Sequence, residues 1–167
     1  SNYHIKSLKS KYPIGEKSSL TAVKGCLQGI DEIMKNRHKN IFCAVRPPGH
    51  HALNTGKHEG FCFYNHVAIS AKYIQNKYKL KKILIIDWDY HHGNSTELFF
   101  YDDPSVLFFS THDANAYPRT GSPDRIGSGK GKGYNVNIHL PCGTTDKEII
   151  STYENILVKK ANIFKPD

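Results

Sequence analysis

Three side chains that could bind a metal ion stand at alternate positions of one short stretch, Asp87, Asp89 and His91. In an extended chain alternate side chains leave on the same face, so the three would point the same way. A buried carboxylate without a partner is costly, and a divalent cation would compensate it. Aspartate oxygen and histidine nitrogen are both ordinary zinc ligands. The spacing therefore predicts a metal site. The alternative is a tight turn in which Asp89 caps a helix and the histidines are solvated.

Two adjacent histidines, His50 and His51, form a second group of residues that could take part in catalysis. The pKa of histidine lies near neutral pH, so such a pair is suited to general acid and base catalysis. Asp87 could orient one ring, as a carboxylate does for a catalytic imidazole, and Asn94 could orient the other. On that arrangement the ring paired with Asp87 should be the more easily protonated. The two histidines could instead be solvated loop residues or metal ligands themselves.

Apolar runs and turn signals indicate the elements that would position these residues. Ile83–Ile86 is a run of four aliphatic residues, typical of a parallel strand buried on both faces, which we expect over 83–88. Further strands are predicted at 41–45, 106–110 and 134–140, helices at 18–36, 60–78, 96–101 and 146–163, and loops at 1–17 and 111–133. This alternation predicts an α/β fold with an open, mostly parallel sheet flanked by helices. Ligands of such sheets bind at the carboxyl ends of the strands.

Length and composition describe one soluble domain. The chain has 167 residues, 38% of them hydrophobic and 23% charged, enough for a real core. The net charge of +8 is spread without a basic run longer than a pair, so we predict no direct sequence-specific nucleic-acid binding. The four cysteines form no C-x-x-C pair, and no apolar run approaches the roughly 20 residues of a membrane span. We therefore expect a reduced intracellular protein, in the cytoplasm or nucleus and off the membrane.

Aromatic side chains could form the walls of a binding channel. Gly60-Phe61 and Tyr117 are predicted to lie on loops that reach the same mouth of the sheet. Two flat rings facing each other would make a narrow channel for an aliphatic chain. The alternative places Phe61 in the core.

The remaining histidines are expected to have other roles. His92 is predicted to be buried and hydrogen-bonded, and His112 could lie near the site without being a ligand. Surface or structural positions are assigned to the others, His4, His38, His58, His66 and His139.

Five segments together resemble the histone deacetylase superfamily, which includes the acetylpolyamine amidohydrolases. They are Arg46–Ala52, Gly60–Asn65, Ile86–Asn94, Tyr117-Pro118 with Thr120-Gly121, and Gly129–Asn137. The Arg-Pro-Pro-Gly lead and the asparagine after His-His-Gly resemble the class II branch more than class I. The resemblance implies an open α/β sheet related to that of arginase. It also implies metal-dependent hydrolysis of an N-acyl amide, typically acetyl-lysine in histones or other proteins.

The resemblance also implies a role for each motif residue. Zinc is the implied metal, and iron(II) stays open because Asp/His sets accept either ion. By this resemblance Asp89 and His91 are metal ligands, and His50 and His51 are the acid/base residues, with His51 as the main proton shuttle. The resemblance further implies that Asp87 orients His50 and that Asn94 orients His51. It also implies a tunnel for acyl-lysine lined by Gly60, Phe61 and Tyr117, and a structural potassium ion bound by Asp87, Asp89, His91, Ser110 and Thr111.

The chain also departs from the family pattern. The third metal ligand, an aspartate after the next strand, is absent, as is the tyrosine of the glycine-rich C-terminal loop. Lys165–Asp167 resembles the lead-in to that strand. Ser95 and Arg119 stand where glycine is common in the family. We therefore expect an N-terminal part of a deacetylase domain, truncated before its C-terminal strands and inactive by itself.

Three other functions stay open at this point. The first is deacetylation of acetylpolyamines or other small N-acyl amines. The second is an arginase-type hydrolase with two manganese ions, and the third is a non-catalytic module that binds acyl-lysine or acyl-polyamine. Nucleic-acid binding through the positive charge would show a steep salt dependence, which we do not expect.

Overall fold

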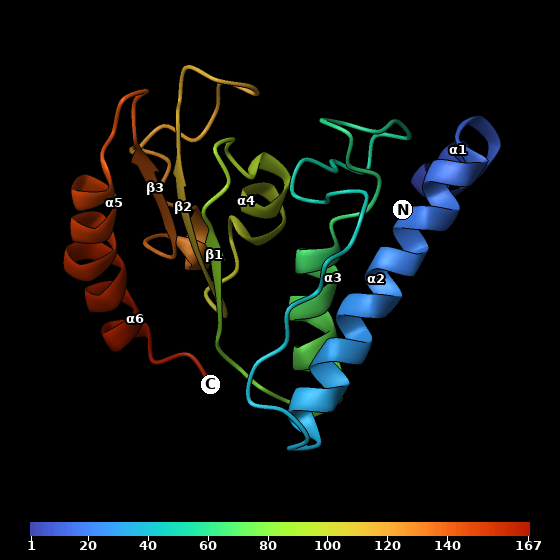
Figure 1. Ribbon diagram of the computed structural model, residues 1–167, viewed down its shortest axis with the longest axis horizontal. Coiled ribbons are helices and arrows are strands. Elements are labelled where there is room, and N and C mark those ends of the chain that lie inside the picture. Colours follow the sequence, from blue (N-terminus) through green and yellow to red (C-terminus); the bar gives the residue numbers. More distant parts are fainter. The chain divides into compact units, whose positions relative to one another are not determined.

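The computed structural model describes all residues, 1–167. The chain forms two compact units, Ser1–Lys79 and Leu80–Asp167, called here the N-terminal and the C-terminal unit. The N-terminal unit is helical, and the C-terminal unit contains a sheet with helices (Figure 1). None of the helices combines the length and apolar character of a membrane span. The single domain expected from the chain length stays a prediction.

The first two helices occupy a region that the sequence predicted to be a loop. α1 (Asn2–Lys11) begins at Ser1, whose side-chain oxygen accepts a hydrogen bond from the backbone N–H of His4 at 3.2 Å. α2 (Pro13–Met34) follows directly, with Pro13 at its start. A proline is tolerated there because the first N–H groups of a helix have no helical partner. The loop prediction for residues 1–17 is wrong because Pro13 opens a helix instead of interrupting the chain.

α3 (His66–Tyr73) runs into a π-helical turn, Ile74–Tyr78. The side chain of Asn65 caps α3 by accepting a hydrogen bond from a backbone N–H of the first turn at 2.9 Å. The helix therefore ends where predicted but begins six residues later than residue 60, at His66. The aromatic segment before it is not helical, since Phe61 has a left-handed backbone with a φ of 65°.

A carboxylate ties α2 to the end of the α3 segment. Oδ1 of Asp31 accepts hydrogen bonds from the hydroxyls of Tyr73 (2.8 Å) and Tyr78 (2.7 Å). Lys77 Nζ lies 2.9 Å from the same oxygen. The bonds from Tyr78, Lys77 and Tyr73 together lower the pKa of Asp31 to about 2. These contacts fix the helices that flank the 35–65 segment.

The strand predicted at residues 41–45 is absent. No strand partner pairs with this segment, and Phe42 is 92% exposed. Alternate side chains lie against α2: a Cβ at Gly29 would come within 2.9 Å of Ile41 Cγ2 and 3.0 Å of Cys43 Sγ. The segment therefore packs on a helix and not in a sheet. A run of apolar residues becomes a strand only where a neighbouring backbone completes its hydrogen bonds.

The C-terminal unit contains a parallel sheet of three strands, β1 (Ile83–Asp87), β2 (Val106–His112) and β3 (Asn135–His139), in the order β1-β2-β3. The register pairs Asp87 with Ser110, at the carboxyl ends of β1 and β2. This agrees with the predicted parallel α/β architecture. β2 continues through residue 112, so the loop expected from residue 111 begins two residues later.

The burial of β1 differs from the prediction, whereas β2 is buried as expected. β2 is buried along its whole length, as befits the central strand. β1 is an edge strand of this sheet: only Ile85 is fully buried, and Ile86 is 39% exposed. Within the C-terminal unit β1 pairs only with β2, and the predicted burial on both faces does not hold for the whole Ile83–Ile86 run.

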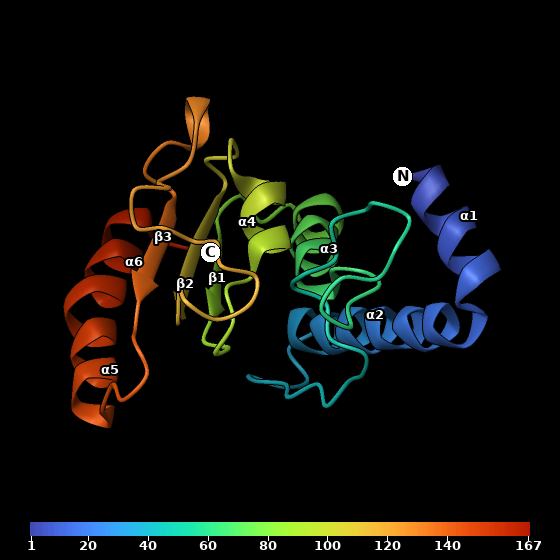
Figure 2. The same cartoon turned by 90° about the horizontal axis from the view of Figure 1, so that it is seen from above.

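Helices lie on both faces of the sheet. α4 (Asn94–Phe100) contacts one face, and α5 (Asp146–Thr152), a π-helical turn (Tyr153–Leu157) and α6 (Val158–Phe164) lie on the other (Figures 1 and 2). Alternate side chains of β2 separate the two layers. Phe109 packs on the Tyr153 ring, with ring centroids 5.7 Å apart, whereas Phe108 faces His92. The helices predicted at 96–101 and 146–163 are thus confirmed within a few residues.

Candidate metal and catalytic site

Asp89 and His91 meet just beyond the carboxyl end of β1. Asp87 Oδ1 accepts a hydrogen bond from the backbone N–H of Asp89 at 3.2 Å, and Asp89 Oδ1 accepts one from the N–H of His91 at 2.7 Å. Each aspartate side chain thereby stabilises a turn, because it accepts a hydrogen bond from the backbone N–H two residues ahead. As a result Asp89 Oδ1 and His91 Nδ1 lie 3.1 Å apart. The side chains converge in a turn instead of along an extended strand. Asp89 does not cap α4, whose N-cap residue is Gly93.

The spacing of Asp89 Oδ1 and His91 Nδ1 fits two ligands of one metal ion. Two ligands of one tetrahedral zinc, each at about 2.0–2.2 Å, stand about 3.3–3.5 Å from each other. Asp89 Oδ1 and His91 Nδ1 are hydrogen-bonded to each other here, and their separation of 3.1 Å is close to that value. Both side chains are partly open to solvent, at 49% and 42%. Within either unit no group of three histidine, cysteine, aspartate or glutamate side chains could hold one ion. This chain therefore contributes a pair of candidate ligands.

The residues proposed for potassium surround the same strand ends. Asp87 and Ser110 are register partners, so they lie side by side at the end of the sheet. The hydroxyl of Thr111 hydrogen-bonds to Tyr153 at 3.0 Å, on the opposite face of β2. Only the backbone of Thr111 can therefore face the side of the sheet on which Ser110 lies.

Two buried imidazoles support this end of the sheet. His92 is buried and its Nδ1 lies 2.7 Å from Thr120 Oγ1, which confirms the predicted hydrogen-bonding role. His112 is also buried; Nε2 lies 3.0 Å from the carbonyl of Gly121 and Nδ1 lies 2.9 Å from Ser110 Oγ. Burial, with the nearby His92, lowers the pKa of His112 to about 4. The ring is thus neutral near pH 7, donates from Nε2 and accepts at Nδ1.

The tandem histidines lie in the N-terminal unit. His51 is buried, His50 is half-buried, and their ring centroids are 4.0 Å apart. Gly49 lets this segment approach the start of α3, since a Cβ there would come within 2.7 Å of the carbonyl oxygen of Tyr64 and 2.9 Å of His66 Cδ2. The rings of His50 and His51 are thus in contact with each other. Their predicted orientation by Asp87 and Asn94, which lie in the other unit, stays a prediction.

His66 is a further histidine of this region. Both of its ring nitrogens are buried without a hydrogen-bond partner, and burial, with His50 nearby, lowers its pKa. The sequence prediction of a surface or structural role did not foresee an unpartnered ring beside the tandem pair. Its place directly after the Gly60–Asn65 motif is the only signal that could have singled it out.

The two aromatic residues predicted to line the channel, Phe61 and Tyr117, are exposed. Phe61 is 77% exposed, so the alternative that placed it in the core is wrong. Tyr117 is half exposed, and its ring lies 6.3 Å from that of His91. Gly60 and Phe61 belong to one unit and Tyr117 to the other, so the channel that they would line together stays a prediction. Arg119, close to Tyr117, has a φ of 61°, a conformation that glycine adopts more easily.

The comparisons with known proteins agree with these motifs. A family profile described as "Histone deacetylase domain" matches residues 11–167, nearly the whole chain. The chain belongs to the histone deacetylase domain family. A probable deacetylase of Archaeoglobus fulgidus is 42% identical over 148 residues, which cover 89% of this chain and 41% of that protein. Histone deacetylase 7 of Homo sapiens is 45% identical over 136 residues, covering 77% of this chain and 14% of that protein.

The fold agrees as well. The crystal structure of the HDA15 HD domain matches with a TM-score of 0.91 and 34% identity, over 99% of this chain and 53% of that chain. The α/β architecture expected from the sequence is thus confirmed. The chain spans less than half the length of those two curated relatives and about half of the solved domain.

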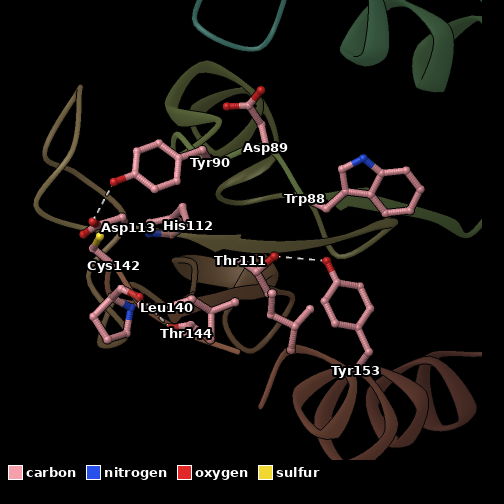
Figure 3. A pocket seen from close by; sticks show the side chains of 13 residues that line it. Trp88, Asp89, Tyr90, Thr111, His112, Asp113, Leu140, Cys142, Thr144 and Tyr153 are labelled. Carbon is pink, nitrogen blue, oxygen red and sulfur yellow. Dashed lines mark hydrogen bonds between the residues drawn. The ribbon is translucent and has the colours of Figure 1, made fainter. Parts of the chain in front are cut away.

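The structure of this deacetylase domain also contains a cavity that the sequence did not predict. It has a volume of about 330 Å³ and lies beside Asp89, at the ends of β1 and β2 (Figure 3). Tyr90 lines it, donating a hydrogen bond from its hydroxyl to Asp113 Oδ2 at 2.9 Å. The backbone bond from Asn115 and the hydroxyl of Tyr90 lower the pKa of Asp113. No sequence pattern indicated this pair, because its members belong to the loops after different strands.

Proposed function

We propose that this deacetylase domain belongs to an enzyme that removes acyl groups, acetyl above all, from lysine side chains of histones or other proteins. The observation that supports this most strongly is the placement of Asp89 Oδ1 and His91 Nδ1 within 3.1 Å of each other at the carboxyl end of β1. That edge is where open α/β sheets bind their ligands.

Zinc is the metal that we propose for this pair, with Asp89 and His91 as two of its ligands. A bound Zn²⁺ would polarise the acyl carbonyl and lower the pKa of water to about 7. Asp87, next to Ser110 in the sheet register, would help to hold a structural potassium ion behind the ligands. Carboxylate and hydroxyl oxygens suit such a hard cation.

The tandem histidines would move the protons. A neutral imidazole takes a proton from the attacking water, and an imidazolium returns one to the leaving amine. With the rings of His50 and His51 only 4.0 Å apart, a positive charge on one disfavours a second charge on the other. Such a pair holds one proton more readily than two, which suits a base that must become an acid within one turnover. We assign the main shuttle to His51.

The exposed aromatic rings would bind the substrate. Tyr117, beside the candidate ligand His91, and Phe61 would contact the aliphatic part of an acyl-lysine side chain. An apolar channel of this kind excludes water from the amide and holds it in place for attack.

Replacing His51 in the intact protein that contains this domain tests the proposal. His51→Ala should lower kcat for an acetyl-lysine peptide by at least about 10²-fold, the lower range of general acid–base contributions. Zinc content, measured by metal analysis, should stay unchanged, because His51 is not one of the proposed ligands. His58→Ala is the matched control, since His58 is an exposed histidine of the same unit that packs on the rings of Tyr12 and Phe63. Near-normal turnover in His51→Ala would remove the acid/base assignment. Acetylputrescine as a second substrate would distinguish lysine from polyamine specificity.

A further inference from the structure

Glu97 is a buried carboxylate that the proposed reaction does not use. It lies in α4, is 2% exposed, and receives contacts from three separate segments. Arg125 Nε donates to Oε1 at 2.6 Å, and the side-chain amides of Asn135 (2.9 Å) and Asn137 (2.6 Å) donate to Oε2. Nε2 of His92 lies 3.3 Å from Oε2. One carboxylate thus joins α4, β3, the turn after β1 and the loop between β2 and β3.

The carboxylate stays ionised despite its burial. Burial raises its pKa, but the contacts from His92, Asn137, Asn135 and Arg125 outweigh that effect and lower the pKa to about 2. Glu97 in turn raises the pKa of Arg125. A buried charge with several donors is expensive to disrupt, because removing one partner leaves the others uncompensated. The cluster of Glu97 with His92, Arg125, Asn135 and Asn137 is therefore expected to be a rigid part of the C-terminal unit.

The cluster anchors the β2–β3 loop (residues 113–134). Arg125 ties the second half of the loop to Glu97. Thr120 lies against His92, whose other ring nitrogen faces Glu97, and the carbonyl of Gly121 accepts from His112. The loop is thus held at consecutive points along one side of the buried network.

Tyr117 lies on this loop immediately before the anchored residues. Its ring is 6.3 Å from that of His91, the candidate ligand, and His91 directly precedes His92 in the turn. Glu97 is therefore connected to the channel wall through Arg125 and to the ligand turn through His92. None of the four contacts of Glu97 described above is with Tyr117 or His91.

We infer that Glu97 is a positioning residue, whose buried charge holds the β2–β3 loop so that Tyr117 stands beside His91. The structural part of this inference is independent of catalysis. Its effect on substrate binding rests on the proposed function. A rigid, preset wall contributes to binding because less side-chain and loop freedom is lost when the substrate enters.

Hydrogen exchange tests the structural part with the chain itself. Glu97→Gln keeps the size of the side chain but removes the charge, and it places an amide N–H₂ against groups that are themselves donors. The amides of Arg119 and Arg125, which donate within the loop to Ala116 and Ser122, should exchange at least about tenfold faster. The amide of Ile83, in β1, donates to the carbonyl of Ser105 outside the loop and should keep its protection. Glu148→Gln, an exposed glutamate of α5, is the control and should leave the loop unchanged.

Steady-state kinetics test the effect on the substrate. In the intact protein Glu97→Gln should raise KM for an acetyl-lysine peptide about fivefold or more with kcat nearly unchanged, the signature of lost uniform binding. Arg125→Lys, which keeps the positive charge, should retain part of the tether. If Glu97→Gln does not fold, Arg125→Gln tests the same tether from the partly exposed end of the pair.

Unchanged loop exchange in Glu97→Gln and Arg125→Gln would overturn the inference. A loosened loop in a variant whose KM equals that of the unsubstituted protein would overturn the effect on substrate binding. Absence of deacetylation in the unsubstituted protein is a different failure: it would remove the proposed function, while the exchange result still decides whether Glu97 holds the loop.

Discussion

Replacing Gly121 with alanine tests the packing of the β2–β3 loop on the buried histidines. Gly121 has a φ of 83°, and a Cβ there would come within 2.4 Å of His112 Nε2 and 2.6 Å of His92 Cδ2. Both rings are fully buried, and His112 is also hydrogen-bonded to Ser110 Oγ through Nδ1, so neither ring can move away freely. Gly133 is the matched control. It has a φ of 92°, and its Cβ would meet nothing within 4 Å.

The expected magnitudes follow from this difference. A non-glycine residue in the left-handed region costs roughly 1 kcal/mol relative to glycine. Both substitutions incur that cost. Forcing an extra methyl group into a packed interior adds about 1–3 kcal/mol, and only Gly121→Ala incurs it. We therefore expect Gly133→Ala to lower the free energy of unfolding by about 1 kcal/mol, and Gly121→Ala by about 2–4 kcal/mol.

Urea unfolding followed by circular dichroism measures both values. A thermal melt gives a second measure, with a shift in Tm of about 2–4 °C per kcal/mol for a chain of this size. If the two alanine variants lose the same stability, the rings of His92 and His112 do not confine the loop at Gly121. The steric part of the argument would then be refuted, and the network inferred around Glu97 would lose one of its anchors.

Two further predictions concern the titration of His112 and the candidate metal pair. The pKa of His112 is lowered to about 4 by burial and the nearby His92, below the ordinary value of 6.5, so the unfolded chain binds this proton more readily than the folded one. The free energy of unfolding should therefore decrease as pH falls from about 6.5 to 4, by up to about 3 kcal/mol from this group; NMR titration of the imidazole signals checks the pKa directly. Asp89→Asn in the intact protein should weaken zinc binding by more than about 100-fold, beyond the 10–100-fold typical of residues that only support ligands, as measured by competition with a chelator.

Each of these predictions has its own control. His38 is an exposed loop histidine and provides a reference signal in the same spectra. A pKa of His112 at or above the ordinary value would contradict the burial argument. Asp102→Asn changes an exposed aspartate outside the site and should leave the zinc affinity unaltered. Equal affinities of Asp89→Asn and the unsubstituted protein would exclude Asp89 as a ligand.

The parts of the fold that local pattern determines could be predicted from the sequence. The aliphatic run of β1, the apolar run of β2 and the alternation of β3 each specify a strand, and the polar residues after β1 mark its carboxyl end. The helices of the C-terminal unit follow from the same periodicity. Errors arose where one local signal had two outcomes. Pro13 can interrupt a chain or open a helix, and residues 41–45 pack on α2 without a strand partner.

The polar network of the site could not be predicted in the same way. Glu97, Arg125 and Asn137 are separated by 28 and 12 residues, and no periodicity relates them. Their contact depends on how the loop after β2 returns to β3, which is a tertiary property. A lone glutamate in a short helix is ordinarily a solvated residue. Only its burial and its donors distinguish this one.

Asp89 and His91 lie close together as the sequence predicted, but for a different physical reason from the one expected. Alternation along an extended strand predicted it, yet β1 ends at Asp87 and the two side chains meet because successive aspartates accept backbone N–H groups two residues ahead. Asparagine supports the same turn with its side-chain carbonyl oxygen. Asp89→Asn should therefore preserve the turn and remove only the negative charge from the ligand, so a loss of zinc in that variant reports on coordination. Asp89→Ala would remove the turn as well, and the same loss would then have two explanations.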